Sequence, residues 1–219
     1  MNWDLIWSSF GPLITGAVTG TIPLTLASFA FGLILALVVA LMRLSPNWFL
    51  SGIGRFYVSV IRGTPLLVQL FVIFFGLPSI GIRLDPWPSA IIAFSLNVGG
   101  YAAEIIRAAI LSVPKGQWEA GHTIGMSRPQ ALVRIILPQA ARVSVPPLSN
   151  TFISLVKDTS LASLILVTEL FRNAQQIAAF SQEFMALYLQ AALVYWVICL
   201  ALSTAQSAVE KRLDRYVAH

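Results

Sequence analysis

The feature that most constrains this chain is the run from Thr15 to Leu41, which contains no charged side chain. A helix needs about 20 apolar residues to cross the hydrocarbon core of a bilayer, and this run is longer. The composition agrees, because 57% of the residues are hydrophobic and only 11% are charged, against about 25% charged residues in soluble domains. The chain is therefore predicted to be an all-α integral membrane protein, in which each span satisfies its own backbone hydrogen bonds.

Four further apolar stretches follow, and together they predict a single membrane domain over residues 1–219 with about five spans. The second span is interrupted near its start by residues 62–65. The fourth is discontinuous, because the polar residues 157–160 divide it into two halves that are each too short to cross comfortably. The expected spans cover residues 15–41, 56–77, 89–110, 143–167 and 184–208.

Basic residues are strongly biased to one side of this arrangement, and cytoplasmic loops carry an excess of Lys and Arg. That side holds Arg43, Arg55, Arg107, Lys115, Arg128, Arg134, Arg142, Lys211, Arg212 and Arg215. The opposite side holds only Arg83 and Arg172. The N-terminus is therefore predicted to lie outside the cell, and the C-terminus to lie in the cytoplasm.

The longest polar interval, residues 112–138, falls on the cytoplasmic side. Pro114 can open a short helix and Gly125 can close it, since glycine readily takes the left-handed conformation past a helix end. Ser127 and Gln130 form a capping-box pattern that begins a second short helix. That helix is expected to end around Leu137, because the next residue is a proline. The interval is thus predicted to be a helix–turn–helix outside the membrane.

Several function classes are disfavoured by what the chain contains. The net charge of +5 is spread among the gaps between apolar runs, whereas a nucleic-acid-binding protein gathers its basic residues on one face. The sequence has one cysteine and two histidines, which form no recognisable metal or catalytic motif. It also has no G-x-x-x-x-G-K-[ST] motif. We therefore expect neither an enzyme nor a bound cofactor or metal.

The spacing of small and apolar residues in the cytoplasmic interval is its most specific signal. The residues concerned are Glu119, Ala120, Gly121, Gly125, Ile135, Leu137 and Pro138. Their spacing resembles the EAA loop of ABC importer permeases, E-A-A-x3-G-x9-I-x-L-P, and departs from it only at Gly121, where a small residue is kept. The resemblance implies that this loop docks on a separate cytoplasmic ATPase, which would use ATP and Mg²⁺. The alternative is an ordinary surface loop with a capped helix.

Other segments resemble the polar amino acid permeases within that family. They are Arg62-Gly63-Thr64-Pro65-Leu66, Ser95-Leu96-Asn97, Tyr101-Ala102-Ala103-Glu104 and Lys157-Asp158-Thr159-Ser160-Leu161. Two more, Leu41-Met42-Arg43-Leu44-Ser45-Pro46 and residues 146–154, are most similar to cystine-type permeases. This resemblance implies the type I ABC importer fold and ATP-driven, alternating-access import of a polar amino acid such as L-cystine. The alternative substrates are a basic amino acid, glutamine, glutamate and an opine.

The same resemblance implies the setting and the partners. The chain is expected in the bacterial cytoplasmic (inner) membrane, as one of two permease copies, with a homodimer favoured over a heterodimer. An ATPase dimer would dock from the cytoplasm, and a binding protein outside would deliver the amino acid. A secondary transporter or channel would explain the spans equally well. It gives no reason for the spaced docking loop, and the internal repeat typical of such proteins is not visible.

Charged residues at membrane depth cost about 2.5–3.5 kcal/mol each on insertion scales, so they usually face a cavity or a partner. Asp158 lies where the fourth span breaks, and breaks of this kind expose groups that bind charged substrates. We therefore predict that Asp158 binds the substrate ammonium and that Asn97, with Thr159 or Ser160, supplies hydrogen bonds. Resemblance to the basic amino acid permeases supports Asn97 and Asp158. The alternative is a structural ion pair of Asp158 with Lys157 or Arg62.

Arg62, Glu104 and Lys157 are candidates for a gate or for ion pairs. Glu104 precedes Arg107 by three residues on the same predicted helix, which favours a local pair. The functional alternative is a gate in which Arg62 and Glu104 exchange partners between conformations.

Overall fold

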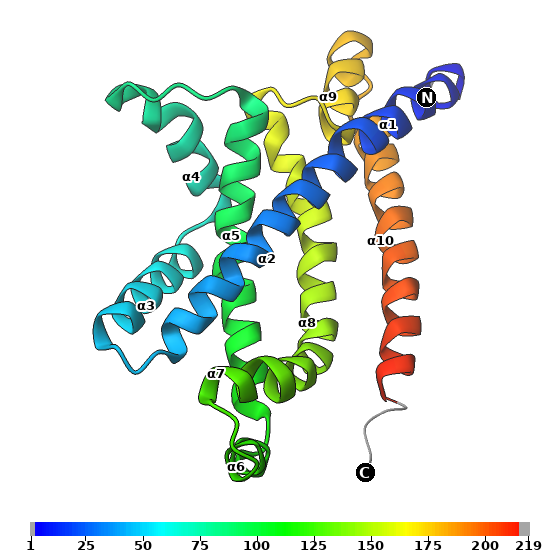
Figure 1. The fold of residues 1–219 in the computed structure, drawn as a ribbon. Helices are drawn as coiled ribbons and strands as arrows, with labels where there is room; N and C mark the ends of the chain where they lie inside the picture. Colours follow the sequence, from blue (N-terminus) through cyan, green and yellow to red (C-terminus); the bar gives the residue numbers. More distant parts are fainter. Residues whose placement is uncertain (1–2, 215–219) are drawn as a thin grey trace.

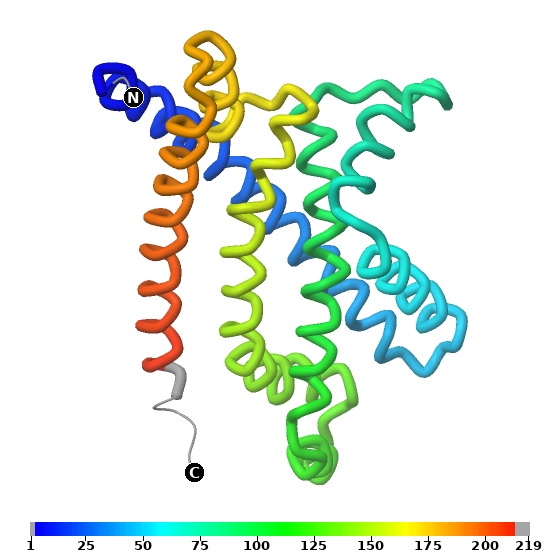
Figure 2. Tube along the Cα trace, turned by 180° about the vertical axis from the view of Figure 1, so that it is seen from behind, coloured from blue at the N-terminus to red at the C-terminus, as the bar shows by residue number. Residues whose placement is uncertain are grey.

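A computed structural model describes residues 3–214, and all regular elements in that range are helical. Figure 1 shows α2 (Ile22–Leu44), α5 (Pro86–Ser112), α8 (Leu137–Asp158) and α10 (Phe184–Asp214) running between the two ends of the molecule. The short helix α6 (Lys115–Thr123) protrudes at one end, and α9 (Leu170–Ser181) lies at the other. Figure 2 shows the same arrangement from behind, with α10 beside α8. The helices α5 and α10 include the predicted spans 89–110 and 184–208.

The first span is longer than predicted, because α1 (Trp3–Gly16) continues into α2 through a π-helical turn, Ala17–Thr21. The helical segment Trp3–Leu44 is therefore unbroken. Pro23 does not interrupt it, since it occupies the first turn of α2 directly after the π turn. A proline is tolerated inside a membrane helix where a local π turn compensates for the hydrogen bond that it cannot donate.

The second span is interrupted at residues 62–65, as predicted, but it begins earlier than residue 56 and the interruption is a sharp bend. The chain forms α3 (Trp48–Gly63) and then α4 (Leu66–Phe71), which continues through single turns to Ile80. The two parts are bent by 105° at the break. Thr64 is extended, with φ −122° and ψ 145°, because the ring of Pro65 disfavours helical geometry in the preceding residue.

The predicted end of the second cytoplasmic helix near Leu137 is wrong. The helix α7 (Arg128–Ala131) passes through a π turn, Leu132–Ile136, directly into α8. In the π turn the Leu137 N–H donates to the Leu132 carbonyl, five residues earlier. The wider turn accommodates the ring of Pro138, which follows it directly inside the continuous helix.

The fourth span also breaks differently from the prediction. At residues 157–160 the α-helix changes into a 3-10 segment, Thr159–Ile165, without a sharp bend. The 48° bend comes later, between Ile165 and Leu170, where Leu166 adopts a left-handed conformation. Within residues 3–214, three helical segments are long and apolar enough to cross a membrane unbroken, and the two bent pairs raise the number to five.

Buried Glu169 joins this second bend to the first span and to α10. Its carboxylate accepts hydrogen bonds from the Arg172 N–H at 2.6 Å and the Tyr195 hydroxyl at 2.8 Å. It also accepts one from the hydroxyl of Thr21 at 3.3 Å. Gly20 permits this approach, because a Cβ there would lie 2.5 Å from the Thr168 carbonyl oxygen. The buried acid is therefore satisfied by neighbouring donors, as burial of a charge requires.

The main core lies where α2 crosses α5, with α3 packed alongside. Phe94 and Val98 of α5 are buried in this cluster, as are Ala36 and Ala40 of α2. Small residues allow membrane helices to approach closely and gain packing energy. At Gly100 the approach of α3 is close enough that an added Cβ would lie 2.5 Å from Cγ2 of Ile61.

Replacing Gly100 with Ala is expected to destabilise the protein by about 1–3 kcal/mol, because overpacking forces the neighbouring side chain to move. The matched control is Gly52→Ala, since a Cβ on Gly52 of α3 meets nothing within 4 Å. That control should be neutral or slightly stabilising, because alanine has the higher helix propensity. The measurement is the thermal unfolding temperature of both variants in mild detergent. Equal unfolding temperatures would contradict the packing argument.

Candidate functional site

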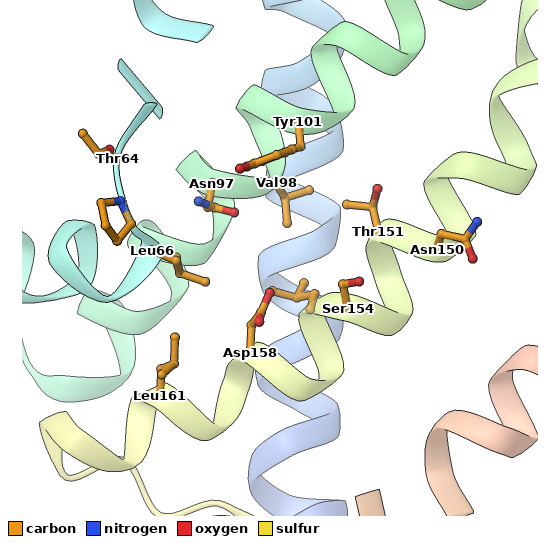
Figure 3. Close-up of a pocket in the computed structure, with 12 residues that line it drawn as sticks. Thr64, Leu66, Asn97, Val98, Tyr101, Asn150, Thr151, Ser154, Asp158 and Leu161 are labelled. Carbon is orange, nitrogen blue, oxygen red and sulfur yellow. The ribbon is translucent and has the colours of Figure 1, made fainter. Parts of the chain in front are cut away.

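A polar cavity of about 430 Å³ lies between α5, α8 and the break that separates α3 from α4. Figure 3 shows side chains from all three elements around it. Its volume falls within the range of small-molecule sites, about 300–1,000 Å³. The lining residues are Thr64, Pro65, Leu66, Asn97, Val98, Tyr101, Asn150, Thr151, Ser154, Leu155, Asp158 and Leu161.

The α8 wall of the cavity carries a polar stripe. Asn150, Ser154 and Asp158 are spaced four residues apart, which places them on one face of the helix. Asp158 is the last residue of α8 and is partly buried. Within residues 3–214 its carboxylate has no hydrogen bond and no ion pair, so the structure contains neither alternative pair, with Lys157 or with Arg62. The cavity therefore holds an unpaired anionic acceptor.

The α5 wall contributes Asn97 and, one turn later, Tyr101. The amide nitrogen of Asn97 donates to Oε1 of Gln69 at 3.0 Å. The Arg62 guanidinium lies over the Tyr101 ring, 5.4 Å from its centre, which is within cation–π range. Thus two of the four predicted substrate residues, Asn97 and Asp158, share one cavity although they come from different helices.

The other two predicted substrate residues do not line this cavity. Thr159 is fully buried, and its hydroxyl donates to the Val156 carbonyl at 2.7 Å. The Ser160 hydroxyl donates to the Lys157 carbonyl at 2.7 Å. Both hydroxyls are used within the turn where α8 becomes a 3-10 segment.

Several lining residues were missed by the sequence reasoning. Asn150 and Ser154 could have been found, because polar residues four apart in an apolar run that ends at Asp158 indicate one polar helix face. Thr64 could not, since its place in the cavity depends on the 105° bend.

The candidate gate residues do not form one cluster. Glu104 of α5 binds both Arg43, at the end of α2, and Arg107, three residues further along α5. The expected local pair of Glu104 with Arg107 is therefore present, and Arg43 joins it from another helix. Among the described residues Arg62 makes no ion pair with Glu104, and its guanidinium lies over the Tyr101 ring instead. Lys157 is exposed and makes no side-chain ion pair with any residue that the structure describes.

The predicted docking segment is built around a tight turn. Gly125 has φ +80°, its N–H donates to the His122 carbonyl, and the Met126 N–H donates to the Gly121 carbonyl. This pair of bonds closes α6 in the usual left-handed manner. The N–H of Ser127 donates to Oε1 of Gln130 at 2.9 Å, and the Ser127 side chain accepts from the Gln130 N–H, so the expected capping box is present.

The docking residues divide into an exposed group and an inward group. Glu119, Ala120, Gly125 and Pro138 are exposed. Ile135 and Leu137 pack against a cluster formed by the end of α5 and the start of α8. Gly121 is buried, and a Cβ there would lie 3.2 Å from side-chain atoms of both Ala131 and Ile135. The departure from the family pattern at Gly121 therefore falls at a tightly packed position.

Apolar spans around a polar cavity form the architecture of a transport pathway, so the class of protein is a membrane permease. The chain belongs to the family of binding-protein-dependent transport system inner membrane components, whose sequence profile matches residues 28–215. This is a family of ABC importer permeases, and these are membrane subunits rather than enzymes.

Relatives that match over nearly the whole chain include two amino acid permeases. The L-cystine transport system permease protein TcyB of Bacillus subtilis is 62% identical over 217 residues, covering 99% of this chain and 93% of that protein. The glutamine transport system permease protein GlnP of Escherichia coli (strain K12) is 37% identical over 214 residues, covering 97% of both.

A solved structure of an amino acid transporter has the same fold. The crystal structure of an amino acid ABC transporter with histidines matches with a TM-score of 0.90 at 33% identity, over 97% of this chain and 99% of that one. The predicted type I ABC importer permease fold is confirmed.

Replacing Glu104 with Gln is expected to destabilise the protein by about 1–3 kcal/mol, because it leaves the Arg43 and Arg107 guanidiniums facing each other without an anion. Arg107→Gln is the control, since it leaves the Arg43–Glu104 pair in place and should cost less. Thermal unfolding in detergent measures both. A smaller loss for Glu104→Gln than for Arg107→Gln would show that the acid is not the centre of the cluster.

Proposed function

We propose that this chain imports L-cystine, or a closely related polar amino acid, as the membrane subunit of an ATP-driven transporter. The observation that carries the proposal is the cavity in which the unpaired Asp158 carboxylate faces a wall containing Asn97. The 62% identity to an L-cystine permease supports the choice of substrate. Glutamine is the second candidate, favoured by the 37% identity to a glutamine permease.

In this mechanism the amino acid enters with its ammonium group toward Asp158. An ammonium offers three donors and a full positive charge, and Asp158 has no competing partner among the described residues. A hydrogen bond to a charged group is stronger than one between neutral groups. The hydroxyls of Thr151 and Ser154 provide polar contacts for the rest of the substrate.

Exposed polar residues support a pathway shared by two permease copies. Asn150, Ser154 and Lys157 are exposed on α8, although that helix belongs to the membrane-spanning bundle. Such side chains avoid lipid and face water-filled cavities or partners. A second copy placed on this face would enclose the water-filled path. We favour two identical copies, each contributing one cavity.

The protruding α6 is the proposed docking site for a separate cytoplasmic ATPase, which would hold the ATP and Mg²⁺. Glu119 and Ala120 are exposed there and can contact a partner. Trp118 of α6 packs on the cluster that joins Ile110 of α5 to Ile136, at the entry to α8. A push on α6 is therefore transmitted to both helices that line the cavity. This link couples ATPase closure to alternating access.

The arrangement of the ends supports the proposed orientation in the bacterial cytoplasmic membrane. The described end of α10 lies at the same end of the molecule as α6, whereas α1 and α9 lie at the opposite end (Figure 1). With α6 in the cytoplasm, the N-terminal helix faces the outside, where a binding protein would deliver the amino acid. Arg215, used in the charge argument, lies outside the described residues.

Asp158→Asn is expected to lower L-cystine uptake at least tenfold, because a neutral amide replaces the charged acceptor for the ammonium. The measurement is uptake of labelled L-cystine by liposomes containing the complete transporter. Asp85→Asn, in the exposed loop before α5, should leave uptake unchanged. An Asp158→Asn transporter that still imports at the wild-type rate would refute the binding role.

Gly125→Ala is expected to weaken retention of the ATPase subunit, because alanine is strained at φ +80° and the turn after α6 would move. Gly81→Ala is the matched control. Gly81 has φ +87° and open space around it, but lies in the loop before α5. Both variants carry the same backbone strain, so only docking separates them. The measurement is the amount of ATPase subunit that is recovered with the tagged permease. Equal recovery with the Gly125→Ala and Gly81→Ala variants would rule out α6 as the docking site.

A further inference from the structure

Gln69 of α4 connects the α3–α4 break to the cavity, although it does not line the cavity itself. Its side-chain nitrogen donates to the Ile61 carbonyl at 2.8 Å and to the Thr64 carbonyl at 3.1 Å. It also lies 2.9 Å from the Thr64 hydroxyl. Its side-chain oxygen accepts from the amide nitrogen of Asn97 at 3.0 Å. One side chain therefore joins the break to a cavity wall.

The orientation of both amides follows from the chemistry of these neighbours. A backbone carbonyl can only accept a hydrogen bond, so the group of Gln69 facing Ile61 and Thr64 must be its NH₂. Its carbonyl oxygen is then the atom that meets Asn97. That oxygen can only accept, so Asn97 must turn its own NH₂ toward Gln69.

Asn97 is thereby left with its carbonyl oxygen on the cavity side, as Figure 3 shows. The opposite wall supplies the Asp158 carboxylate, which accepts hydrogen bonds only when ionised. Both walls thus present acceptors, and an ammonium group is the part of an amino acid that satisfies two acceptors at once. If Asn97 were flipped, it would present a donor, which suits a carboxylate instead.

We propose that Gln69 is a positioning residue that fixes the orientation of Asn97 and so makes this part of the cavity select the ammonium end of the substrate. The inference rests on the proposed function, because it assumes that an amino acid occupies the cavity. The break between α3 and α4 is the cause of this arrangement. Bending at Thr64–Pro65 frees carbonyls that would otherwise bond within a helix, and in a membrane such groups need a donor. Gln69 supplies that donor, and in doing so its oxygen is aimed at Asn97.

The test is a double-mutant cycle on the complete transporter in liposomes, supplied with saturating wild-type binding protein so that differences arise in the permease. Gln69→Met keeps the length of the side chain and removes both hydrogen-bonding groups. Alone, it should lower the uptake rate of labelled L-cystine about tenfold. In an Asn97→Ala background it should change the rate less than twofold, because the residue through which it acts is gone.

Gln190→Met is the matched control. Gln190 is a buried residue of α10 whose side-chain amide donates to the Ile6 carbonyl. Neither residue lines the cavity. Replacing Gln190 removes a hydrogen bond from a buried amide to a backbone carbonyl outside the cavity, so the uptake rate of this variant should stay within twofold of wild type. A tenfold effect of Gln69→Met that persists in the Asn97→Ala background would overturn the positioning role. So would an uptake rate unchanged by Gln69→Met.

A second readout does not depend on transport. L-cystine should raise the unfolding temperature of the wild-type and Gln190→Met permease–ATPase complexes, because a ligand stabilises the folded form that binds it. It should not do so for Gln69→Met, and a retained shift there would overturn the proposal. Wild-type protein that shows neither uptake nor a shift with L-cystine would instead refute the proposed substrate. The cycle is then run with the amino acid that the wild type imports.

Discussion

The close crossing of α2 and α5 is the contact on which the other elements depend. Lipid tails are as apolar as the side chains of a span, so helices in a membrane associate through close packing rather than through a hydrophobic drive. Glycine and alanine at the crossing allow that approach, and α3 packs against the same part of α5 through Gly100. Because α5 is held on one face by this crossing, its other side is free to line the cavity with Asn97 and Tyr101.

The break at Thr64–Pro65 has consequences beyond the shape of one span. It turns α4 away from α3 by 105° and brings Thr64 to the edge of the cavity. It also frees backbone carbonyls that Gln69 satisfies. A sequence feature that ends a helix thus both opens space beside α5 and orients an amide in the cavity wall. The bend and the polar chemistry of the site have one cause.

At the other end of the molecule, packing joins α6 to the two cavity helices. Ile110 and Val113 near the end of α5 share a cluster with Ile136 and Ala140, on either side of the start of α8. The continuous helix from Arg128 through α8 makes this possible. Had the second cytoplasmic helix ended near Leu137, as the sequence predicted, a flexible joint would separate the docking segment from the cavity. The π turn that accommodates the proline keeps the connection stiff.

The sequence by itself determined the membrane class, the resemblance to ABC importer permeases and the turn at Gly125, because these follow from local composition, spacing and backbone conformation. It also pointed to Asn97 and Asp158, since polar residues inside apolar runs stand out. Only the tertiary structure decided that these two share a cavity, that Thr159 and Ser160 bond within their own turn, and that Glu104 binds Arg43. The reason is physical. Local rules describe one helix at a time, whereas a site between helices depends on how closely they cross and where they bend.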